Sequence, residues 1–372
     1  MNIVMLGLSI TSSWGNGHAT TYRALVRGLA SRGHDVLFLE RDAPWYAGSR
    51  DLPQPSYCRV RIYDDRGELE RLYAGDIEEA DLVIVGSYVP DGVAVAETVL
   101  QTARGCTAFY DIDTPVTLAA LQSTGARYVE RRQIAAFDLY LTFTGGPTLQ
   151  RLERQFGARR ARALYCSVDP EMYFDESPVE RDRDLGYLGT YSADRQATLE
   201  KLLLEPARAW TAGRFVIAGP QYPGTIRVPS NVQRIIHLAP PEHRSFYNRL
   251  RFTLNVTRRS MVEAGYSPSV RLFEAAACGT PIISDDWPGL STILAPDREI
   301  LLARSARNVL TYLKDLPESE RAAVGARARS RVLTSHTSTH RAAELEEYVA
   351  EVRPGLIAPA ALRPASAAAR PA

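Results

Sequence analysis

The sequence lacks the features that mark several classes of protein. Its 44 Lys and Arg residues balance 43 Asp and Glu residues, giving a formal net charge of +1, so its charge does not favour nucleic acid binding. It contains no run of about 18 apolar residues, so we expect no transmembrane segment. The opening residues MNIVMLGLSI lack the basic stretch and cleavage site of a signal peptide and are typical of a first strand.

Cysteine is scarce, and its spacing excludes two further classes. The sequence has four cysteines and no C-x-x-C pair. They are Cys58, Cys106, Cys166 and Cys278. This spacing provides neither a zinc motif nor a disulfide framework, and it fits the reducing cytoplasm, where we expect the protein.

The composition that remains is that of a globular protein, 45% hydrophobic and 23% charged. Short β-branched runs alternate with helical stretches, which is typical of a parallel α/β fold. In the first half we expect strands at Asn2–Leu8, Val36–Leu39, Leu82–Gly86, Thr107–Tyr110, Leu139–Phe143 and Ala163–Cys166. In the second half we expect strands at Leu185–Gly189, Phe215–Ala218, Val232–Ile236, Phe252–Val256, Pro281–Ser284 and Glu299–Leu302.

The alternation breaks once, which divides the chain into two domains. Residues 169–184, ending in ESPVERDRD, are charged and carry no strand or helix period, so they are typical of an exposed linker. The prediction is a first domain over 1–168 and a second over 185–354. Residues 355–372 are rich in Ala and Pro, and we expect this tail to be disordered.

The first loop is a candidate ligand site because it joins the first strand to the first helix. Gly15, Asn16 and Gly17 resemble the first half of a dinucleotide-binding G-x-G-x-x-G motif, but Thr20 holds the third glycine position. Glu40, at the end of the second strand, keeps that alternative open. His18 is either a base near neutral pH or a structural histidine of the helix start.

Two carboxylates follow the strand at Thr107–Tyr110. Asp111 and Asp113 are two residues apart, so in an extended chain they share one face. They are candidates for binding or deprotonating a hydroxyl group. Asp113 is also a candidate cap for a helix that begins at Pro115, and we favour that interpretation slightly.

A capped helix is predicted in the second domain, in the segment SPSVRLFEAAACGTPIISD. Ser267 is the expected cap and Pro268 the first helical residue. A helix N-terminus attracts phosphate. Glu274, about a turn and a half further on, is placed to accept hydrogen bonds from a ribose.

This segment resembles the donor-site helix of GT-B glycosyltransferases, Glu-Ala-x-Ala-x-Gly-x-Pro-x-Ile-x-x-Asp. The residues Ser-Val-Arg-Leu-Phe before Glu274 are similar to those of the spore-maturation, CgeB-like branch of that superfamily. The first loop and the stretch GYLGTYSADR at 186–195 fit the same resemblance. It implies an α/β protein with two Rossmann-like domains, whose parallel sheets face each other across a cleft, and a last helix that packs back on the first domain.

The resemblance also implies roles for individual residues. Glu274 matches the ribose-binding glutamate, Ser269 and Val270 match the helix start at the diphosphate, and Arg195 matches the cation that neutralises it. Arg258 and Arg259 are further candidate cations, with surface charge as the alternative. The remaining matches to the donor site are Gly189, Thr190, Gly219, His237 and Leu238. Gly15, Asn16, Gly17 and Asp111 are expected to face the acceptor.

We therefore expect a metal-independent glycosyltransferase that moves a sugar from a nucleotide-diphosphate sugar, with UDP-sugar as the first guess, to a hydroxyl acceptor. The nucleotide-sugar is a co-substrate, and no cofactor or metal is implied. His18 is the first choice of base and Asp113 the second if the reaction inverts configuration. Tyr266 stands where many retaining members carry a glutamate, which leaves the stereochemistry open. The alternatives are a nucleotide-sugar epimerase and a non-catalytic protein that binds nucleotide or carbohydrate.

Overall fold

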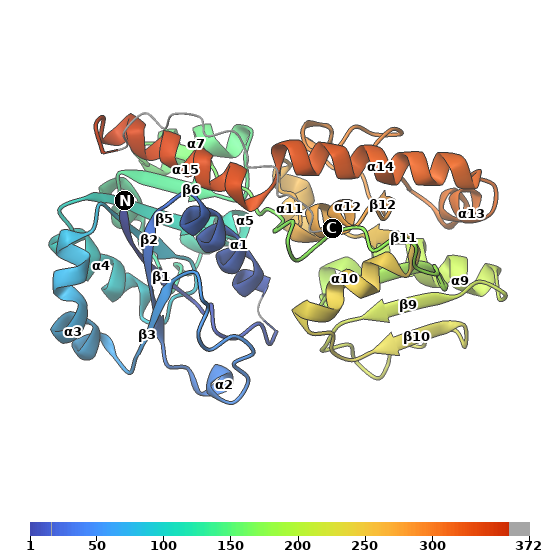
Figure 1. The fold of residues 1–372 in the computed structure, drawn as a ribbon, viewed down its shortest axis with the longest axis horizontal. Coiled ribbons are helices and arrows are strands. Elements are labelled where there is room, and N and C mark those ends of the chain that lie inside the picture. Colours follow the sequence, from blue (N-terminus) through green and yellow to red (C-terminus); the bar gives the residue numbers. More distant parts are fainter. Residues whose placement is uncertain (16, 357–372) are drawn as a thin grey trace, which may run out of the picture.

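A computed structural model describes residues 1–15 and 17–356 of the chain. It contains two α/β units side by side, each built on one parallel sheet (Figure 1). The tail that we expect to be disordered lies, from residue 357 onward, outside the described residues. No helix within the described ranges is long and apolar enough to cross a membrane.

The first unit has a seven-stranded parallel sheet in the order β3-β2-β1-β4-β5-β6-β7. Its strands are β1 (Asn2–Gly7), β2 (Asp35–Arg41), β3 (Arg59–Tyr63), β4 (Leu82–Gly86), β5 (Cys106–Asp111), β6 (Leu139–Thr142) and β7 (Ala161–Ala163). Its helices are α1 (Gly17–Ser31), α2 (Pro44–Ala47), α3 (Arg66–Glu79), α4 (Gly92–Thr102), α5 (Thr114–Gln122), α6 (Arg131–Ala136) and α7 (Pro147–Phe156). The apolar face of α1 is buried at Tyr22, Leu25 and Leu29 because it packs against the sheet.

The second unit has a six-stranded parallel sheet in the order β10-β9-β8-β11-β12-β13. Its strands are β8 (Arg183–Leu188), β9 (Phe215–Ala218), β10 (Val232–Ile235), β11 (Leu250–Asn255), β12 (Ile282–Ser284) and β13 (Leu301–Leu302). Its helical elements are α8 (Ala193–Leu199), the π-helix Glu200–Leu204, α9 (Glu205–Ala209), α10 (Pro240–Asn248), α11 (Arg259–Ala264), α12 (Val270–Ala277), the 3-10 turn Leu290–Thr292, α13 (Ala306–Lys314) and α14 (Glu318–Ser335).

The last helix, α15 (Ser338–Val352), lies over the first unit beside α1 (Figure 1). The two helices approach closely, because a Cβ on Gly28 of α1 would lie 2.4 Å from the carbonyl oxygen of Ser338. Glu346 of α15 accepts hydrogen bonds from Arg32 at 2.6 Å and contacts His34 at 2.7 Å. The chain therefore returns to the first unit after completing the second.

The two chain crossings between the units run side by side. The amide of Val168 donates to the carbonyl oxygen of His336 at 3.2 Å, and the amide of Ser338 donates to the carbonyl oxygen of Val168 at 2.8 Å. Residues 169–182 form no strand or helix, but the segment is not exposed throughout, as we had expected of a linker. Asp169 and Tyr173 are buried, because this segment packs between the units.

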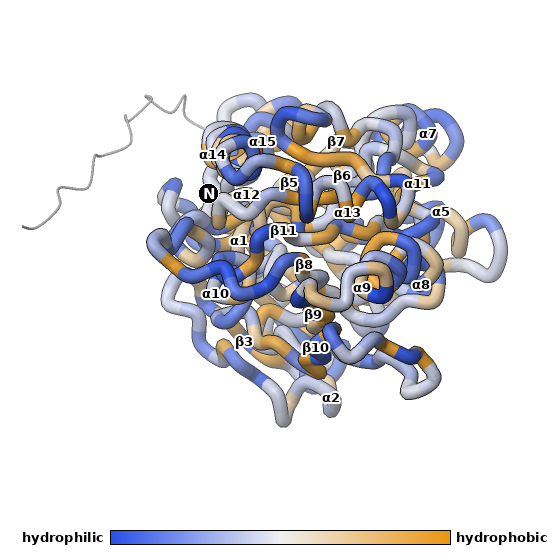
Figure 2. Tube along the Cα trace, turned by 90° about the vertical axis from the view of Figure 1, so that its right-hand side faces the viewer, coloured by the Kyte–Doolittle hydropathy of each residue, from blue (hydrophilic) through white to orange (hydrophobic). Residues whose placement is uncertain are grey.

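Hydrophobic strands account for most of the elements that we could predict. The expected α/β fold with two parallel, Rossmann-like sheets is confirmed. Figure 2 shows hydrophobic stretches gathered in the interior, whereas the outer surfaces of α7 and α10 are largely hydrophilic. Strand β3 was missed because its sequence RVRIY is mostly exposed at the sheet edge, so it lacks a continuous apolar run. Strand β7 lies earlier than the expected 163–166.

Candidate functional site

The cleft between the units lies where the carboxyl ends of both sets of parallel strands face each other. In open parallel sheets this edge is where ligands bind. Two adjoining cavities occupy it. The first, about 240 Å³, has Glu274 in its wall and is called the Glu274 cavity below. The second, about 480 Å³, has His18 in its wall and is called the His18 cavity.

The Glu274 cavity gathers most of the residues that the resemblance assigns to a donor. These are Gly189, Thr190, Arg195, Gly219, His237, Leu238, Val270 and Glu274. Gly15 and Gly17 of the first loop line it from the opposite unit. Asn16, the third residue expected in that loop, lies outside the described residues. Residues distant in the sequence and from both units thus line a single cavity.

Glu274 is only 3% exposed and lies on the buried face of α12. The hydroxyl of Tyr247 donates to its Oε2 atom at 3.1 Å, and Nδ1 of His243 lies 3.9 Å from the same atom. Burial first, and then the negative charge of Glu274, raise the pKa of Tyr173 and Tyr247 well above the usual value. Both phenols therefore remain protonated, and the Tyr247 hydroxyl holds the side chain of Glu274 at the cavity wall.

Helix α12 begins later than the sequence predicted. Its N-cap is Ser269, whose hydroxyl accepts a hydrogen bond from the amide of Arg271 at 3.2 Å. The expected cap, Ser267, instead contacts Thr144 of the first unit through its hydroxyl at 2.6 Å. The free amides of α12 consequently start at Val270, which lines both cavities, and Ser269 itself lines the His18 cavity. This correction moves the helix start into the cleft.

The loop after β8 is held against the end of β9. A Cβ on Gly219 would lie 2.2 Å from the carbonyl oxygen of Gly189, and Gly219 has a φ of 142°. Only glycine fits such an approach and such a backbone conformation. Arg195, from α8 just beyond this loop, donates from Nη2 to the carbonyl oxygen of Thr190 at 2.7 Å. Its Nε atom is buried with no hydrogen-bond partner among the residues that the structure describes.

Arg258 crosses the cleft toward the first unit. Its Nη1 atom lies 3.7 Å from Oδ2 of Asp113, and its Nε atom lies 3.8 Å from Oδ2 of Asp194. It lines the His18 cavity and is 40% exposed on its side chain. Arg259, the other candidate, is an exposed residue paired with Glu263 at 2.8 Å, and it lines neither cavity. Of these two arginines, only Arg258 faces the cleft.

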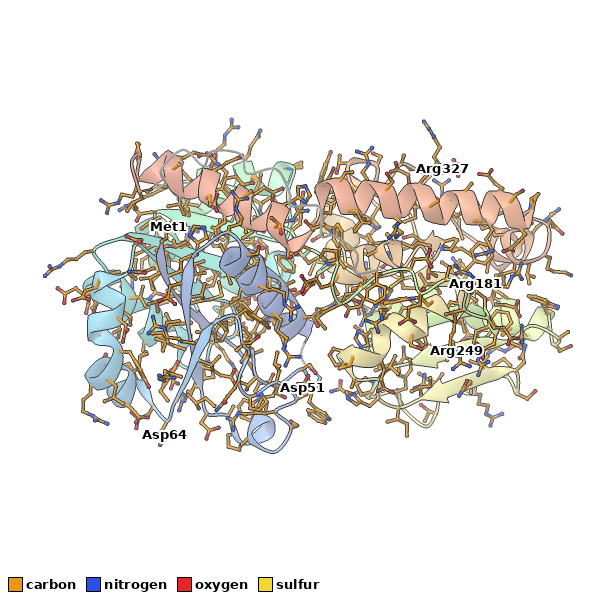
Figure 3. All side chains as sticks on the ribbon, in the orientation of Figure 1. Met1, Asp51, Asp64, Arg181, Arg249 and Arg327 are labelled. Carbon is orange, nitrogen blue, oxygen red and sulfur yellow. The ribbon has the colours of Figure 1, made fainter. Side chains whose placement is uncertain are left out.

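The first loop is fixed by two sets of polar contacts. Glu40 is fully buried and accepts hydrogen bonds from the backbone amides of Ile10 and Thr11 at 2.8 and 3.0 Å. Arg23 forms a two-pronged pair with Asp51 at 2.8 and 3.0 Å. Asp51 lies on the side of the first unit that faces the second (Figure 3). Because Glu40 is occupied in this way, it does not act as the ribose-binding acid of a dinucleotide fold.

His18 and Asp113 lie in the same cavity. The His18 ring makes an edge contact with Tyr88 at a centroid distance of 5.2 Å, and the Tyr88 hydroxyl donates to Asp113 at 3.1 Å. Burial lowers the pKa of His18, and the Asp113 carboxylate opposes this effect. The imidazole is therefore neutral near pH 7 and able to accept a proton.

Asp113 occupies the N-cap position of α5 without capping it. Its side chain makes no cap hydrogen bond and instead faces Tyr88 and Arg258 in the cleft. The capping interpretation that we favoured is therefore wrong for the side chain, although the position is right. The carboxylate is left in the His18 cavity.

Asp111 does not face the acceptor cavity, contrary to expectation. It is the last residue of β5, is fully buried, and lines neither cavity. Its carboxylate accepts hydrogen bonds from Tyr140 and Thr117. The pairing on one face fails because the chain leaves its extended conformation after Asp111, so only Asp113 reaches the cleft. Burial raises the pKa of Asp111 to about 6, and the bonds from Tyr140 and Thr117 partly oppose that rise.

Three groups near the cavities were missed by the sequence reasoning. Arg271 is 7% exposed and lines both cavities, but the sequence reasoning gave it no role. Tyr247 and His243 reach Glu274 from α10, and no motif marked them. Within 1–15 and 17–356, no group of three or more His, Cys, Asp or Glu side chains is placed to hold a metal ion.

The comparisons with known proteins agree with this architecture. Residues 195–347 match the protein family described as Glycosyl transferase-like. This match covers less than half of the chain, namely most of the second unit and part of α15. No curated protein matches the chain at a significant level.

Solved structures extend the likeness to both units, and the fold is that of the GT-B glycosyltransferases. Sucrose-phosphate synthase from Thermosynechococcus elongatus is 14% identical with a TM-score of 0.66, and the alignment covers 94% of this chain and 98% of that one. Anabaena HepE in complex with UDP and glucose is 13% identical with a TM-score of 0.67, covering 94% and 100%. An alpha-glucosyltransferase in complex with UDP is 11% identical with a TM-score of 0.66, covering 94% and 99%. At these identities the likeness establishes the fold.

Proposed function

We propose that the protein is a glycosyltransferase that transfers a sugar from a UDP-sugar to a hydroxyl-bearing acceptor without a metal ion. The observation that carries the proposal is the Glu274 cavity, in which a buried carboxylate, a helix start and Arg195 line one space between the units. A nucleotide-diphosphate sugar needs all three groups. The carboxylate accepts hydrogen bonds from the ribose hydroxyls, and the helix start and Arg195 provide positive potential for the diphosphate.

The donor is oriented by the residues along that cavity. Glu274 accepts hydrogen bonds from the ribose, while Gly219, His237 and Leu238 form the wall around the base. The amides at Val270 face the diphosphate. Uridine is proposed because HepE and the alpha-glucosyltransferase were solved in complex with UDP. The Ser-Val-Arg-Leu-Phe stretch before Glu274 also supports our placement of the chain in the CgeB-like branch.

The acceptor occupies the His18 cavity on the side of the first unit. Transfer breaks the bond between the anomeric carbon and the diphosphate oxygen while the acceptor oxygen bonds to that carbon and loses its proton. Negative charge develops on the leaving diphosphate, where Arg195 and the α12 start stabilise it. In an inverting reaction His18 receives the acceptor proton as a neutral base, with Asp113 as the second candidate. In a retaining reaction the leaving phosphate receives it.

Tyr266 bears on the choice between these outcomes. Its ring lies between two glycines, since a Cβ on Gly146 or on Gly289 would each come within 2.4 Å of a ring carbon. It lines neither cavity. At this position the chain offers no carboxylate to the donor sugar, so we propose that other groups orient the sugar. We place the reaction in the cytoplasm, in keeping with four free cysteines.

The proposal is tested first by thermal shift with UDP, GDP, ADP, uridine and NAD. A ligand that binds the folded state raises the melting temperature by mass action, so UDP is expected to give the largest shift. A shift with NAD and none with any nucleoside diphosphate would overturn the donor assignment.

Turnover is tested with UDP-sugars and a panel of hydroxyl acceptors, read by mass spectrometry. The expected product is an acceptor heavier by one sugar, with equimolar UDP and no change on addition of EDTA. Isomerised UDP-sugar without a glycosylated acceptor would replace the proposal with the epimerase, and binding without turnover over the whole panel would replace it with a binding protein.

A further inference from the structure

Arg271 is a buried cation whose side chain is held by neutral groups. It is 7% exposed. Its Nε atom donates to the carbonyl oxygen of Leu188 at 2.6 Å, and its Nη1 atom donates to Oδ1 of Asn255 at 3.0 Å and to the hydroxyl of Ser269 at 3.3 Å. The guanidinium also lies over the ring of Tyr187, 4.8 Å from its centroid.

The charge of Arg271 has no anionic partner in the described part of the chain. No carboxylate there lies within 4.0 Å of its guanidinium nitrogens. Taking an ion out of water is costly unless an opposite charge compensates it. Carbonyl and amide oxygens satisfy hydrogen bonds but bring no net charge. The buried charge of Arg271 is therefore available to pair with an anion from outside the chain.

The position of Arg271 shows where that anion sits. Five residues line both cavities: Gly15, Gly17, Arg195, Val270 and Arg271. The guanidinium is thus at the junction of the two spaces. A Cβ on Gly189 would lie 2.7 Å from its Nη2 atom, so the glycine at this point leaves that atom uncovered by a side chain.

We propose that Arg271 binds the diphosphate of the donor, at the phosphate that carries the sugar. This inference rests on the proposed function, in which the nucleotide fills the Glu274 cavity and the acceptor fills the His18 cavity. The phosphate linked to the transferred sugar then lies where the cavities meet. Arg271 and Arg195 face it together with the start of α12. When the bond to the anomeric carbon breaks, the electron pair stays on the phosphate oxygen, and the fixed positive charge stabilises it.

The test compares ligands that differ in phosphate content on the full chain. Binding of uridine, UDP and inorganic pyrophosphate is measured by calorimetry for the wild type and for Arg271→Met, which keeps the length of the side chain without its charge. Loss of a charge-assisted contact is expected to weaken UDP roughly ten- to a hundred-fold. Pyrophosphate binding is expected to fall with it, while uridine affinity stays unchanged.

Arg181→Met is the matched control. Arg181 lies in the second unit (Figure 3), donates to the carbonyl oxygen of Leu250 at 2.9 Å and lines neither cavity. Like Arg271, it has no carboxylate within 4.0 Å among the described residues. We expect all three affinities to stay as in the wild type. If Arg271→Met does not fold, Arg271→Lys keeps the charge but not the planar fork, and a smaller loss confined to UDP and pyrophosphate is expected.

Each contrary outcome has a distinct meaning. Unchanged UDP and pyrophosphate binding, or an equal loss of uridine, overturns the role of Arg271 and leaves it a structural residue. Another outcome is that the wild type binds UDP no better than pyrophosphate while Arg271→Met loses pyrophosphate binding. That result overturns the UDP donor but supports the anion site at Arg271. A wild type that binds none of the three ligands overturns both proposals.

Discussion

Replacement of Glu274 by Gln tests the donor site most directly. Glu274 is 3% exposed and is fixed by Tyr247 at 3.1 Å, so its carboxylate is already oriented before a ribose arrives. Gln has nearly the same volume and can still accept from Tyr247 through its amide oxygen. The substitution therefore removes the negative charge with little change in packing.

The expected loss follows from the strength of one charge-assisted hydrogen bond. Such a bond contributes about 1.5–3 kcal/mol when its partner is charged, and each 1.4 kcal/mol is about tenfold in affinity. We therefore expect Glu274→Gln to bind UDP roughly ten- to a hundred-fold more weakly. Removal of the ribose hydroxyls from the ligand should cost the wild type about as much.

The assay is a cycle of two proteins and two ligands, measured by calorimetry. Wild type and Glu274→Gln are each titrated with UDP and with its 2′,3′-dideoxy analogue. If the carboxylate binds the ribose, the variant should lose less affinity than the wild type does when the hydroxyls are absent. An equal loss of affinity in both proteins would refute the contact. Glu346→Gln, a buried glutamate of α15 bonded to Arg32, is the control and should leave both affinities unchanged.

Three further outcomes are expected. Arg195→Met should lower kcat with a UDP-sugar roughly tenfold or more. Substitution of the exposed Arg259 by Met is the control and should leave kcat unchanged. A normal kcat of Arg195→Met would show that Arg195 is only a surface charge. If the reaction inverts, kcat should fall as the pH decreases below the usual histidine pKa of 6.5, because burial lowers the pKa of His18. This fall in kcat should be absent from the pH profile of His18→Ala. Full activity of that variant would show that His18 is not the base. Burial raises the pKa of Asp111 from its ordinary value of 3.8 to about 6 in the folded protein, so its ionisation destabilises the fold as the pH rises through this window. Asp111→Asn should therefore gain stability relative to wild type between pH 4 and pH 7, by at most about 3 kcal/mol in urea unfolding, and a constant difference would contradict the raised pKa.

Some of the cleft could be predicted from sequence because it depends on local pattern. The strand before Gly189 and the helix that carries Glu274 are mostly apolar and are followed by a glycine, so both of them were predictable. Gly219 followed from the resemblance, and the structure places it against Gly189. Features of this kind can be predicted because they depend on short stretches of consecutive residues.

Other features depend on contacts that no short pattern records. Asp111 and Asp113 look equivalent in sequence, but the end of β5 turns one into the core and the other into the cleft. Ser267 and Ser269 are both good caps, and the hydroxyl of Thr144 in the other unit occupies the first. Arg271 was passed over because its burial arises from packing against Tyr187, a residue more than eighty positions away.

The return of α15 to the first unit has a consequence for chain connectivity. The amino-terminal strand and the last described helix belong to the same unit, and the two crossings at Val168 and His336 are joined by backbone hydrogen bonds. Topologically, the second unit is thus an insertion into the first, attached by these two crossings. If one sheet rotates relative to the other, both crossings must bend together. The cleft would then open and close about the point where Val168 and His336 are joined. A truncation before Ser338 would leave the second unit whole and remove α15 from the surface of the first.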